Sequence, residues 1–84
     1  MTNIIIYTKE NCPYCVLAKT LLTERGVTFS EVRIDLDDSK RDEMVRLSNK
    51  RTVPQIFIND QPIGGYDDLA ALAKSGKLDG LLKS

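Results

Sequence analysis

The sequence predicts an α/β fold in which a four-stranded mixed sheet is flanked by helices, in the order β-α-β-α-β-β-α. Two observations carry this prediction. A β-branched run at 3–7 precedes an amphipathic helical pattern and then a second alternating run, which is the order of a strand–helix–strand unit. A further helical pattern precedes two short apolar runs joined by a two-residue turn, which predicts a β-hairpin. With 84 residues, the chain is expected to form one domain, 1–84, around a small core.

Charge and hydropathy exclude several classes of partner. Twelve basic residues balance twelve acidic residues, so the formal net charge is zero. Nucleic acids and anionic membranes bind surfaces with a basic excess, and we expect neither as a partner. No apolar run approaches the roughly 18 residues of a transmembrane helix, and the first residues do not resemble a signal peptide. We therefore expect a monomeric protein of the cytoplasm.

The first strand and helix have clear sequence boundaries. The continuous β-branched and aromatic run at 3–7 is typical of a strand covered on both faces, so we place it at the centre of the sheet. A helix is expected to begin near Pro13, whose fixed φ suits the first turn, and to end at Gly26. The apolar positions with helical spacing are Tyr14, Leu17, Ala18, Leu21 and Leu22.

The middle of the chain predicts a strand followed by a weaker helix. In the stretch 27–36, Val32, Ile34 and Leu36 alternate with polar residues, so the second half of this stretch is expected to form the strand. The polar segment 37–49 opens with residues that can cap a helix. Its expected buried side consists of Met44, Val45 and Leu47.

The last part of the chain predicts the hairpin and a closing helix. Residues 55–58 and 61–63 flank an Asn-Asp turn, and Pro62 cannot donate to a ladder, so its strand is expected at a sheet edge. Asp67 or Asp68 is expected to cap a third helix that ends at Gly76. One more apolar turn, formed by Leu78, Leu81 and Leu82, is expected to close the core.

The two cysteines of the chain, Cys12 and Cys15, are the strongest candidates for chemistry. Pro13 places Cys12 at or just before a helix N-terminus, where free N–H groups and the helix dipole favour a thiolate. A structural disulfide closing so short a loop would add little stability, and a metal site would lack further cysteine or any histidine. In a protein of the cytoplasm this spacing indicates redox chemistry.

Three motifs together resemble a known family. Cys-Pro-Tyr-Cys at 12–15 follows the first strand, Thr-Val-Pro at 52–54 precedes the third, and Gly-Gly-x-Asp-Asp at 64–68 precedes the third helix. A CxxC motif alone is weak, but these motifs in this order resemble the small dithiol glutaredoxins over nearly the whole chain. The resemblance implies a thioredoxin-like fold.

The resemblance also implies an activity. The protein would be a glutathione-dependent thiol–disulfide oxidoreductase that reduces protein disulfides and protein–glutathione mixed disulfides, with Cys12 as nucleophile and Cys15 as resolving thiol. Glutathione would be a co-substrate, and no metal or other permanently bound cofactor is expected. Ribonucleotide reductase is one candidate protein substrate. Two alternatives are a thioredoxin-like reductant served by a flavoprotein reductase, and a carrier of a glutathione-bridged [2Fe–2S] cluster.

Glutathione carries two carboxylates and one amine, so its groove requires cations at one end and an acid at the other. By resemblance, Lys9 and Arg41 would meet the glycyl carboxylate, Tyr14 would flank the sulfur, and a cis bond would precede Pro54. The resemblance also implies that Asp67, Asp68 and the adjacent backbone hold the γ-glutamyl end. For Lys9 and Arg41 the alternative is a solvated surface charge, and for Asp67 the alternative is a helix cap, which is compatible with the binding role. The expected glutathione-binding residues are Lys9, Tyr14, Arg41, Thr52, Val53, Pro54, Gly65, Tyr66, Asp67 and Asp68.

Overall fold

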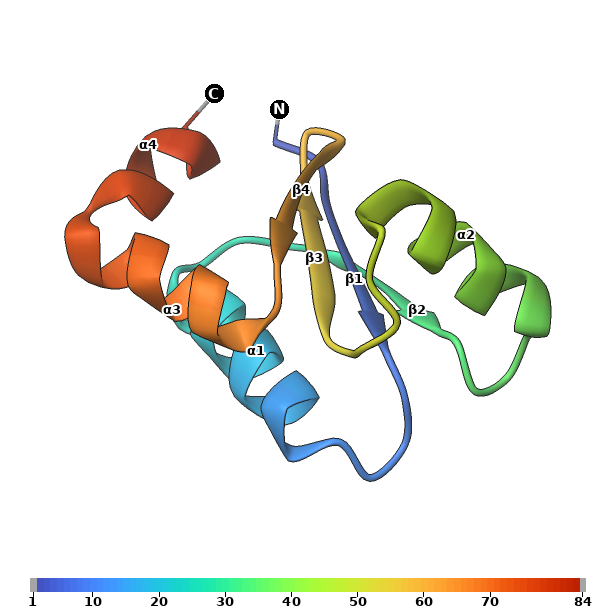
Figure 1. The fold of residues 1–84 in the computed structure, drawn as a ribbon. Coiled ribbons are helices and arrows are strands. Elements are labelled where there is room, and N and C mark those ends of the chain that lie inside the picture. Colours follow the sequence, from blue (N-terminus) through green and yellow to red (C-terminus); the bar gives the residue numbers. More distant parts are fainter. Residues whose placement is uncertain (1, 84) are drawn as a thin grey trace.

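The computed structural model describes residues 2–83, which form a four-stranded sheet with helices on both faces (Figure 1). The strands are β1 (Ile4–Thr8), β2 (Ser30–Arg33), β3 (Gln55–Ile58) and β4 (Gln61–Gly64). They lie in the order β2-β1-β3-β4, with β1 parallel to β2 and antiparallel to β3, while β3 and β4 form an antiparallel hairpin. The mixed sheet, the central position of β1 and the edge position of the strand that contains Pro62 are confirmed.

Four helices surround the sheet, one more than predicted. They are α1 (Pro13–Glu24), α2 (Asp38–Ser48), α3 (Tyr66–Ser75) and α4 (Lys77–Leu82). Helices α1 and α3 cover one face of the sheet, and α2 covers the other (Figure 1). Gly76 adopts a left-handed conformation at φ 83°, so α3 ends there and the closing apolar turn becomes the separate helix α4. Among residues 2–83, no helix is both long and apolar enough to cross a membrane.

Side-chain alternation along β1 supplies both halves of the core. Ile4 and Ile6 pack with residues of α1, α3 and α4, whereas Tyr7 points to the opposite face and packs with Met44 and Phe57. The rings of Tyr7 and Phe57 make an edge contact with centroids 5.6 Å apart. Because β1 is covered on both faces, its apolar run is continuous rather than alternating. This confirms the reason for placing it at the centre.

The predicted extent of the second strand is wrong. We expected its second half, up to Leu36, to pair, but β2 comprises Ser30–Arg33 and Leu36 is 74% exposed. The last ladder partners are Thr8 and Arg33, and Ile34 N–H still donates to the Thr8 carbonyl at 2.9 Å. Beyond that point β1 has ended, so residues 35 and 36 have no neighbouring strand with which to pair.

The buried face of α1 is rotated from the predicted one. Cys15, Ala18 and Leu22 are buried, whereas Tyr14 and Leu17 are 59% and 45% exposed. The spacing of the buried residues is still helical, because they follow one another at i, i+3 and i+7. The exposed aromatic and aliphatic side chains therefore lie outside the core, next to the cysteines in the sequence.

Helix α2 is confirmed, but one of its expected core residues is not. Asp37 caps the helix by accepting the Ser39 N–H at 2.9 Å. Met44 is fully buried and Val45 packs beside it, whereas Leu47 is 50% exposed. A helix on an open sheet face buries only a narrow stripe, and Leu47 lies outside that stripe.

Glu31 joins β1, β2 and α1 through one carboxylate. Thr8 Oγ1 donates to Glu31 Oε2 at 2.6 Å, and Lys19 Nζ donates to the same oxygen at 2.9 Å. The hydrogen bond from Thr8, and then the bond from Lys19, hold the pKa of Glu31 below its ordinary value of 4.5. A carboxyl group whose pKa is lowered by folding contributes stability above its unfolded pKa and loses it as the pH falls through the folded pKa.

We therefore expect Glu31→Gln to destabilise the protein by about 1 kcal/mol at neutral pH. The difference from the unsubstituted protein should shrink as the pH falls below the ordinary value of 4.5, because Glu31 then becomes protonated in both states. Urea unfolding at several pH values measures this difference. Glu24→Gln, an exposed change at the end of α1, is the control. A Glu31→Gln effect that does not vary with pH would contradict the prediction.

Candidate active site

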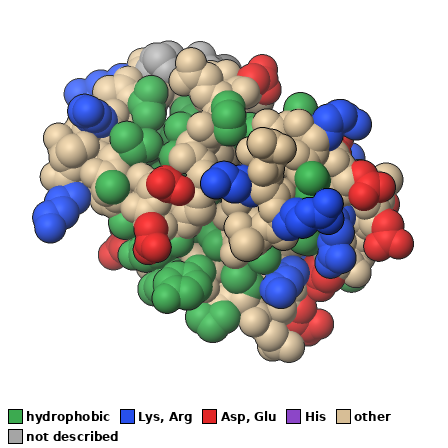
Figure 2. Space-filling model, in the orientation of Figure 1, with side chains coloured by type: hydrophobic (Ala, Val, Ile, Leu, Met, Phe, Trp, Pro, Cys, Tyr) green, Lys and Arg blue, Asp and Glu red, His purple; other side chains and the backbone are tan. Residues whose placement is uncertain are grey.

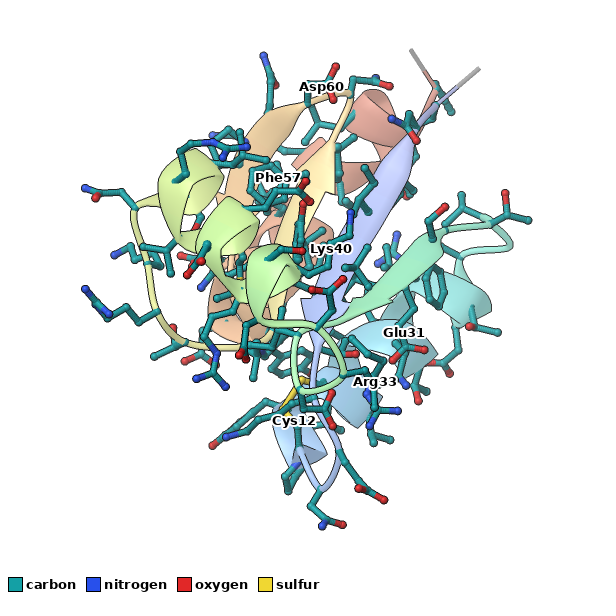
Figure 3. The ribbon with its side chains drawn as sticks, turned by 90° about the vertical axis from the view of Figure 1, so that its right-hand side faces the viewer. Cys12, Glu31, Arg33, Lys40, Phe57 and Asp60 are labelled. Atoms are coloured by element: carbon teal, nitrogen blue, oxygen red, sulfur yellow. A yellow bond between two sulfur atoms is a disulfide. The ribbon has the colours of Figure 1, made fainter. Side chains whose placement is uncertain are left out.

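Cys12 and Cys15 lie at the N-terminus of α1 and form a disulfide (Figure 3). Cys12 is the N-cap residue, with Pro13 as the first residue of the helix, as the sequence predicted. The backbone N–H of Cys15 donates to Cys12 Sγ at 3.2 Å. An N–H group aimed at this sulfur, together with the helix dipole, stabilises negative charge on it when the disulfide is reduced. Cys12 is 8% exposed and Cys15 is 2% exposed.

A loop from the opposite side of the sheet reaches the sulfur of Cys12. The Val53 carbonyl lies 4.0 Å from Cys12 Sγ, and the expected cis peptide bond between Val53 and Pro54 is confirmed. Thr52 precedes this pair, and its hydroxyl accepts a hydrogen bond from the Gln55 amide at 3.2 Å. The loop thus presents main-chain groups of residues 52–54 beside the reactive pair.

Most of the expected glutathione-binding residues surround one hollow of about 310 Å³. Eight of the ten line it, namely Tyr14, Thr52, Val53, Pro54, Gly65, Tyr66, Asp67 and Asp68. The Tyr14 and Tyr66 rings lie with centroids 6.2 Å apart. Tyr66 is half-buried, and besides lining the hollow it packs on the core.

The acidic end of this hollow is built differently from the prediction. Neither Asp67 nor Asp68 is the N-cap of α3, because Gly65 holds that position. Asp68 is the third residue of the helix, and its Oδ2 accepts the Gly65 N–H at 3.0 Å. Gly64, at φ 117°, turns the chain so that this bond can form. Asp67 is exposed in the first turn and adds its charge to the hollow.

The remaining two expected residues, Lys9 and Arg41, line a second hollow. Both hollows include Thr52 and Val53, so they adjoin at the loop that contacts Cys12. The hollow with Asp67 and Asp68 also contains one cation, Lys50, whereas cations predominate in the second hollow. Lys9 also lines a third hollow together with Cys12.

Two residues of the second hollow were missed as site residues by sequence reasoning. Arg46 follows Asp42 by one helical turn, and Arg51 directly precedes the Thr-Val-Pro motif; both line the hollow. Its position next to the motif is the sequence signal that could have identified Arg51. No sequence signal identified Arg46, because its proximity to Val53 arises from the packing of α2. Among residues 2–83, no three His, Cys, Asp or Glu side chains converge as ligands for a metal ion.

Comparison with known proteins assigns the family. The glutaredoxin family model matches residues 4–63. The chain is 58% identical over 83 residues to glutaredoxin 3 of Escherichia coli strain K12, covering 99% of this chain and all of that protein. It is 46% identical to a glutaredoxin of Pseudomonas aeruginosa over the full length of both.

Solved structures confirm the thioredoxin-like fold. The solution structure of glutaredoxin from Brucella melitensis is 48% identical, with a TM-score of 0.87, covering 99% of this chain and 90% of that one. A buckwheat glutaredoxin–glutathione complex is 27% identical, with a TM-score of 0.90, covering 98% and 77%. With a cysteine pair at a helix N-terminus, this fold and these relatives, the chain belongs to the glutaredoxin family of thiol–disulfide oxidoreductases.

Proposed function

We propose that this protein uses glutathione to reduce protein disulfides and protein–glutathione mixed disulfides. The observation that carries the proposal is the position of Cys12, whose sulfur lies at a helix N-terminus and 4.0 Å from the Val53 carbonyl. The loop that holds Val53 separates a hollow with two aspartates and Lys50 from a hollow in which four cations predominate. A peptide with a central cysteine, a free amine and a distal carboxylate matches this arrangement.

In the proposed mechanism, the Cys12 thiolate attacks one sulfur of a substrate disulfide and the other substrate sulfur leaves as a thiolate. For a protein disulfide, Cys15 then attacks Cys12 Sγ, so the second substrate thiol leaves and the Cys12–Cys15 disulfide forms. One glutathione thiolate opens that disulfide by attacking Cys12, and a second attacks the resulting adduct to give oxidised glutathione and the dithiol enzyme. The disulfide form described here is the oxidised state of this cycle.

The proposed glutathione site extends across both hollows. Lys9 and Arg41 bind the glycyl carboxylate, the Val53 main chain pairs with the cysteinyl unit, and Asp67 with its neighbours binds the γ-glutamyl amine. The charges and positions of these residues support the assignment, because opposite charges flank the reactive sulfur. Tyr14 covers the glutathione sulfur in this proposal, which its exposure and its position in the lining of the first hollow support.

We also propose the physiological setting. The enzyme acts as a monomer in the cytoplasm, needs no permanently bound cofactor, and reduces proteins that cycle through a disulfide, of which ribonucleotide reductase is one candidate. The paired cysteines support this setting, because a redox-cycling dithiol requires a reducing supply of thiol.

A pair of coupled assays tests the proposed reductant. One supplies glutathione with glutathione reductase, and the other supplies thioredoxin reductase, each with a glutathione mixed disulfide of 2-mercaptoethanol as substrate. We expect turnover with glutathione and none with thioredoxin reductase. Turnover with thioredoxin reductase alone would replace the proposal by the thioredoxin-like alternative.

Lys9→Glu should weaken the nucleophile. Lys9 is exposed and lines both the third hollow, which includes Cys12, and the second hollow, so its charge favours the thiolate and the glycyl carboxylate alike. We expect the pH midpoint for alkylation of reduced Cys12 to lie well below the value of about 8.5 for a free cysteine, and to rise in the variant. Iodoacetamide reaction rates against pH measure both midpoints. Lys77→Glu on α4 is the charge-matched control, and equal midpoints in the two variants would contradict the prediction.

A further inference from the structure

The second hollow contains more positive charge than one glycyl carboxylate requires. Four cations, Lys9, Arg41, Arg46 and Arg51, line it together with a single carboxylate, Asp42. The chain as a whole carries no net charge, so this is a local excess. Figure 2 shows Lys and Arg side chains gathered on the side of the molecule where α2 lies.

None of these four cations forms an ion pair within residues 2–83, although the charge of Arg46 acts on Tyr7. Within residues 2–83, the ion pairs are Lys19–Glu31, Arg25–Asp79, Arg33–Asp35 and Lys40–Glu43. None of them includes a cation of the second hollow, and all four of those side chains are exposed. Exposed cations without an ion pair, in a hollow that has one carboxylate for four of them, remain available to carboxylates of a bound molecule.

The position of the hollow determines what can reach it. The second hollow shares Thr52 and Val53 with the first hollow, and the Val53 carbonyl lies 4.0 Å from Cys12 Sγ. A polypeptide joined to Cys12 through its own cysteine therefore crosses this loop. In the proposed site, the residue that follows the cysteine of glutathione points toward Lys9 and Arg41. A polypeptide bound in the same direction places the residues after its cysteine in the cationic hollow.

We propose that this hollow, through Arg46 and Arg51 in addition to Lys9 and Arg41, binds acidic residues that directly follow the reactive cysteine of a protein substrate. This inference rests on the proposed function, because the chain direction is that of glutathione in its groove. The partner is thus an acidic polypeptide segment. Acidic residues before the cysteine would instead face the first hollow, where Asp67 and Asp68 outnumber the one cation, Lys50, and no positive excess attracts them.

The test measures how fast Cys12 captures peptides that differ only in the placement of charge. Each peptide has one cysteine, activated as a mixed disulfide with 2-thiopyridine, and two glutamates either after or before that cysteine; a third has neutral residues only. Reduced Cys15→Ser protein is used so that the adduct persists. The Cys12 thiolate attacks the peptide sulfur, the Cys12–peptide disulfide forms, and thiopyridine leaves as the thiolate whose absorbance reports the rate.

We expect the peptide with glutamates after the cysteine to react roughly 3- to 10-fold faster than the neutral peptide, and the peptide with glutamates before it to react no faster. The advantage should disappear at about 0.5 M salt, where exposed charges are screened. Arg46→Gln with Arg51→Gln should reduce the ratio of acidic to neutral rates toward one. Lys74→Gln with Lys77→Gln, which removes the same charge from α3 and α4, should leave that ratio unchanged.

The inference would be overturned if the two acidic peptides reacted at equal rates. It would also be overturned if the ratio of acidic to neutral rates were the same with and without the Arg46→Gln and Arg51→Gln substitutions. Turnover of the 2-mercaptoethanol–glutathione disulfide by the unsubstituted protein separates this failure from a failure of the proposed function. If that turnover is present without an acidic preference, only the docking surface is wrong. If it is absent, the glutathione-dependent function is wrong, and the chain direction assumed here fails with it.

Discussion

Cys12→Ser should abolish all turnover, whereas Cys15→Ser should retain reduction of glutathione mixed disulfides and lose most reduction of protein disulfides. The sulfur of Cys12 accepts a hydrogen bond from the Cys15 N–H at the start of α1, and this bond favours a thiolate at Cys12. Cys15 is 2% exposed and follows in the first turn, so it cannot replace Cys12 in attacking a substrate. A glutathione adduct on Cys12 can be resolved by a second glutathione, but release of a protein from Cys12 requires the internal thiol.

Two substrates and one mass measurement check this prediction. The 2-mercaptoethanol–glutathione disulfide reports the reaction that needs only Cys12, and a protein disulfide reports the reaction that needs both cysteines. Cys15→Ser incubated with oxidised glutathione should gain one glutathione, located at Cys12. If Cys12→Ser kept its activity on the glutathione substrate while Cys15→Ser lost it, the two roles would be reversed.

Gly64→Ala should be the most destabilising of the three glycine substitutions compared here. Gly64 has φ 117°, a conformation essentially restricted to glycine, and an added Cβ would collide with the carboxylate of Asp68. That carboxylate accepts the Gly65 N–H at the start of α3. We expect a loss of about 2–4 kcal/mol, combining backbone strain with the loss of the helix-capping bond. Because Gly64 and Asp68 line the first hollow, affinity for glutathione should fall as well.

Two other glycines separate these contributions. Gly26 has φ 74° with no atom within 4 Å of a built Cβ, so Gly26→Ala should show backbone strain without a collision. Gly80 lies inside α4, also with nothing within 4 Å, so Gly80→Ala should stabilise the protein by about 0.5–1 kcal/mol through helix propensity. Urea unfolding measures all three. A Gly64→Ala loss no larger than that of Gly26→Ala would show that Asp68 moves aside without cost.

Sequence patterns predicted the elements that depend on local chemistry. Pro13 and Gly26 marked the ends of α1, and the Asn-Asp pair marked the hairpin, because these residues restrict or extend the backbone conformations available at one position. Pro13 also placed Cys12 at the helix N-terminus, for the same reason. The cis bond before Pro54 was predicted from the family motifs, because no local rule would have favoured it.

Patterns were less successful where partners from distant parts of the chain decide the outcome. Alternation extended β2 to Leu36, but a strand continues only where a neighbour pairs with it, and β1 ends at Thr8. Helical spacing put Tyr14 and Leu17 on the apolar stripe of α1, but the angle at which α1 packs on the sheet decides which side of that stripe is covered.

By itself, the sequence determined the cysteine chemistry, the order of the elements and the charges available to bind a substrate. Only the tertiary structure decided which of those charges act together. Arg46 and Arg51 come from a helix and a loop, and they share a hollow with Lys9 because α2 packs on the face of the sheet that Tyr7 and Phe57 build. Net charge is a sum over the chain and is zero, whereas the potential at a site depends on distances that packing sets.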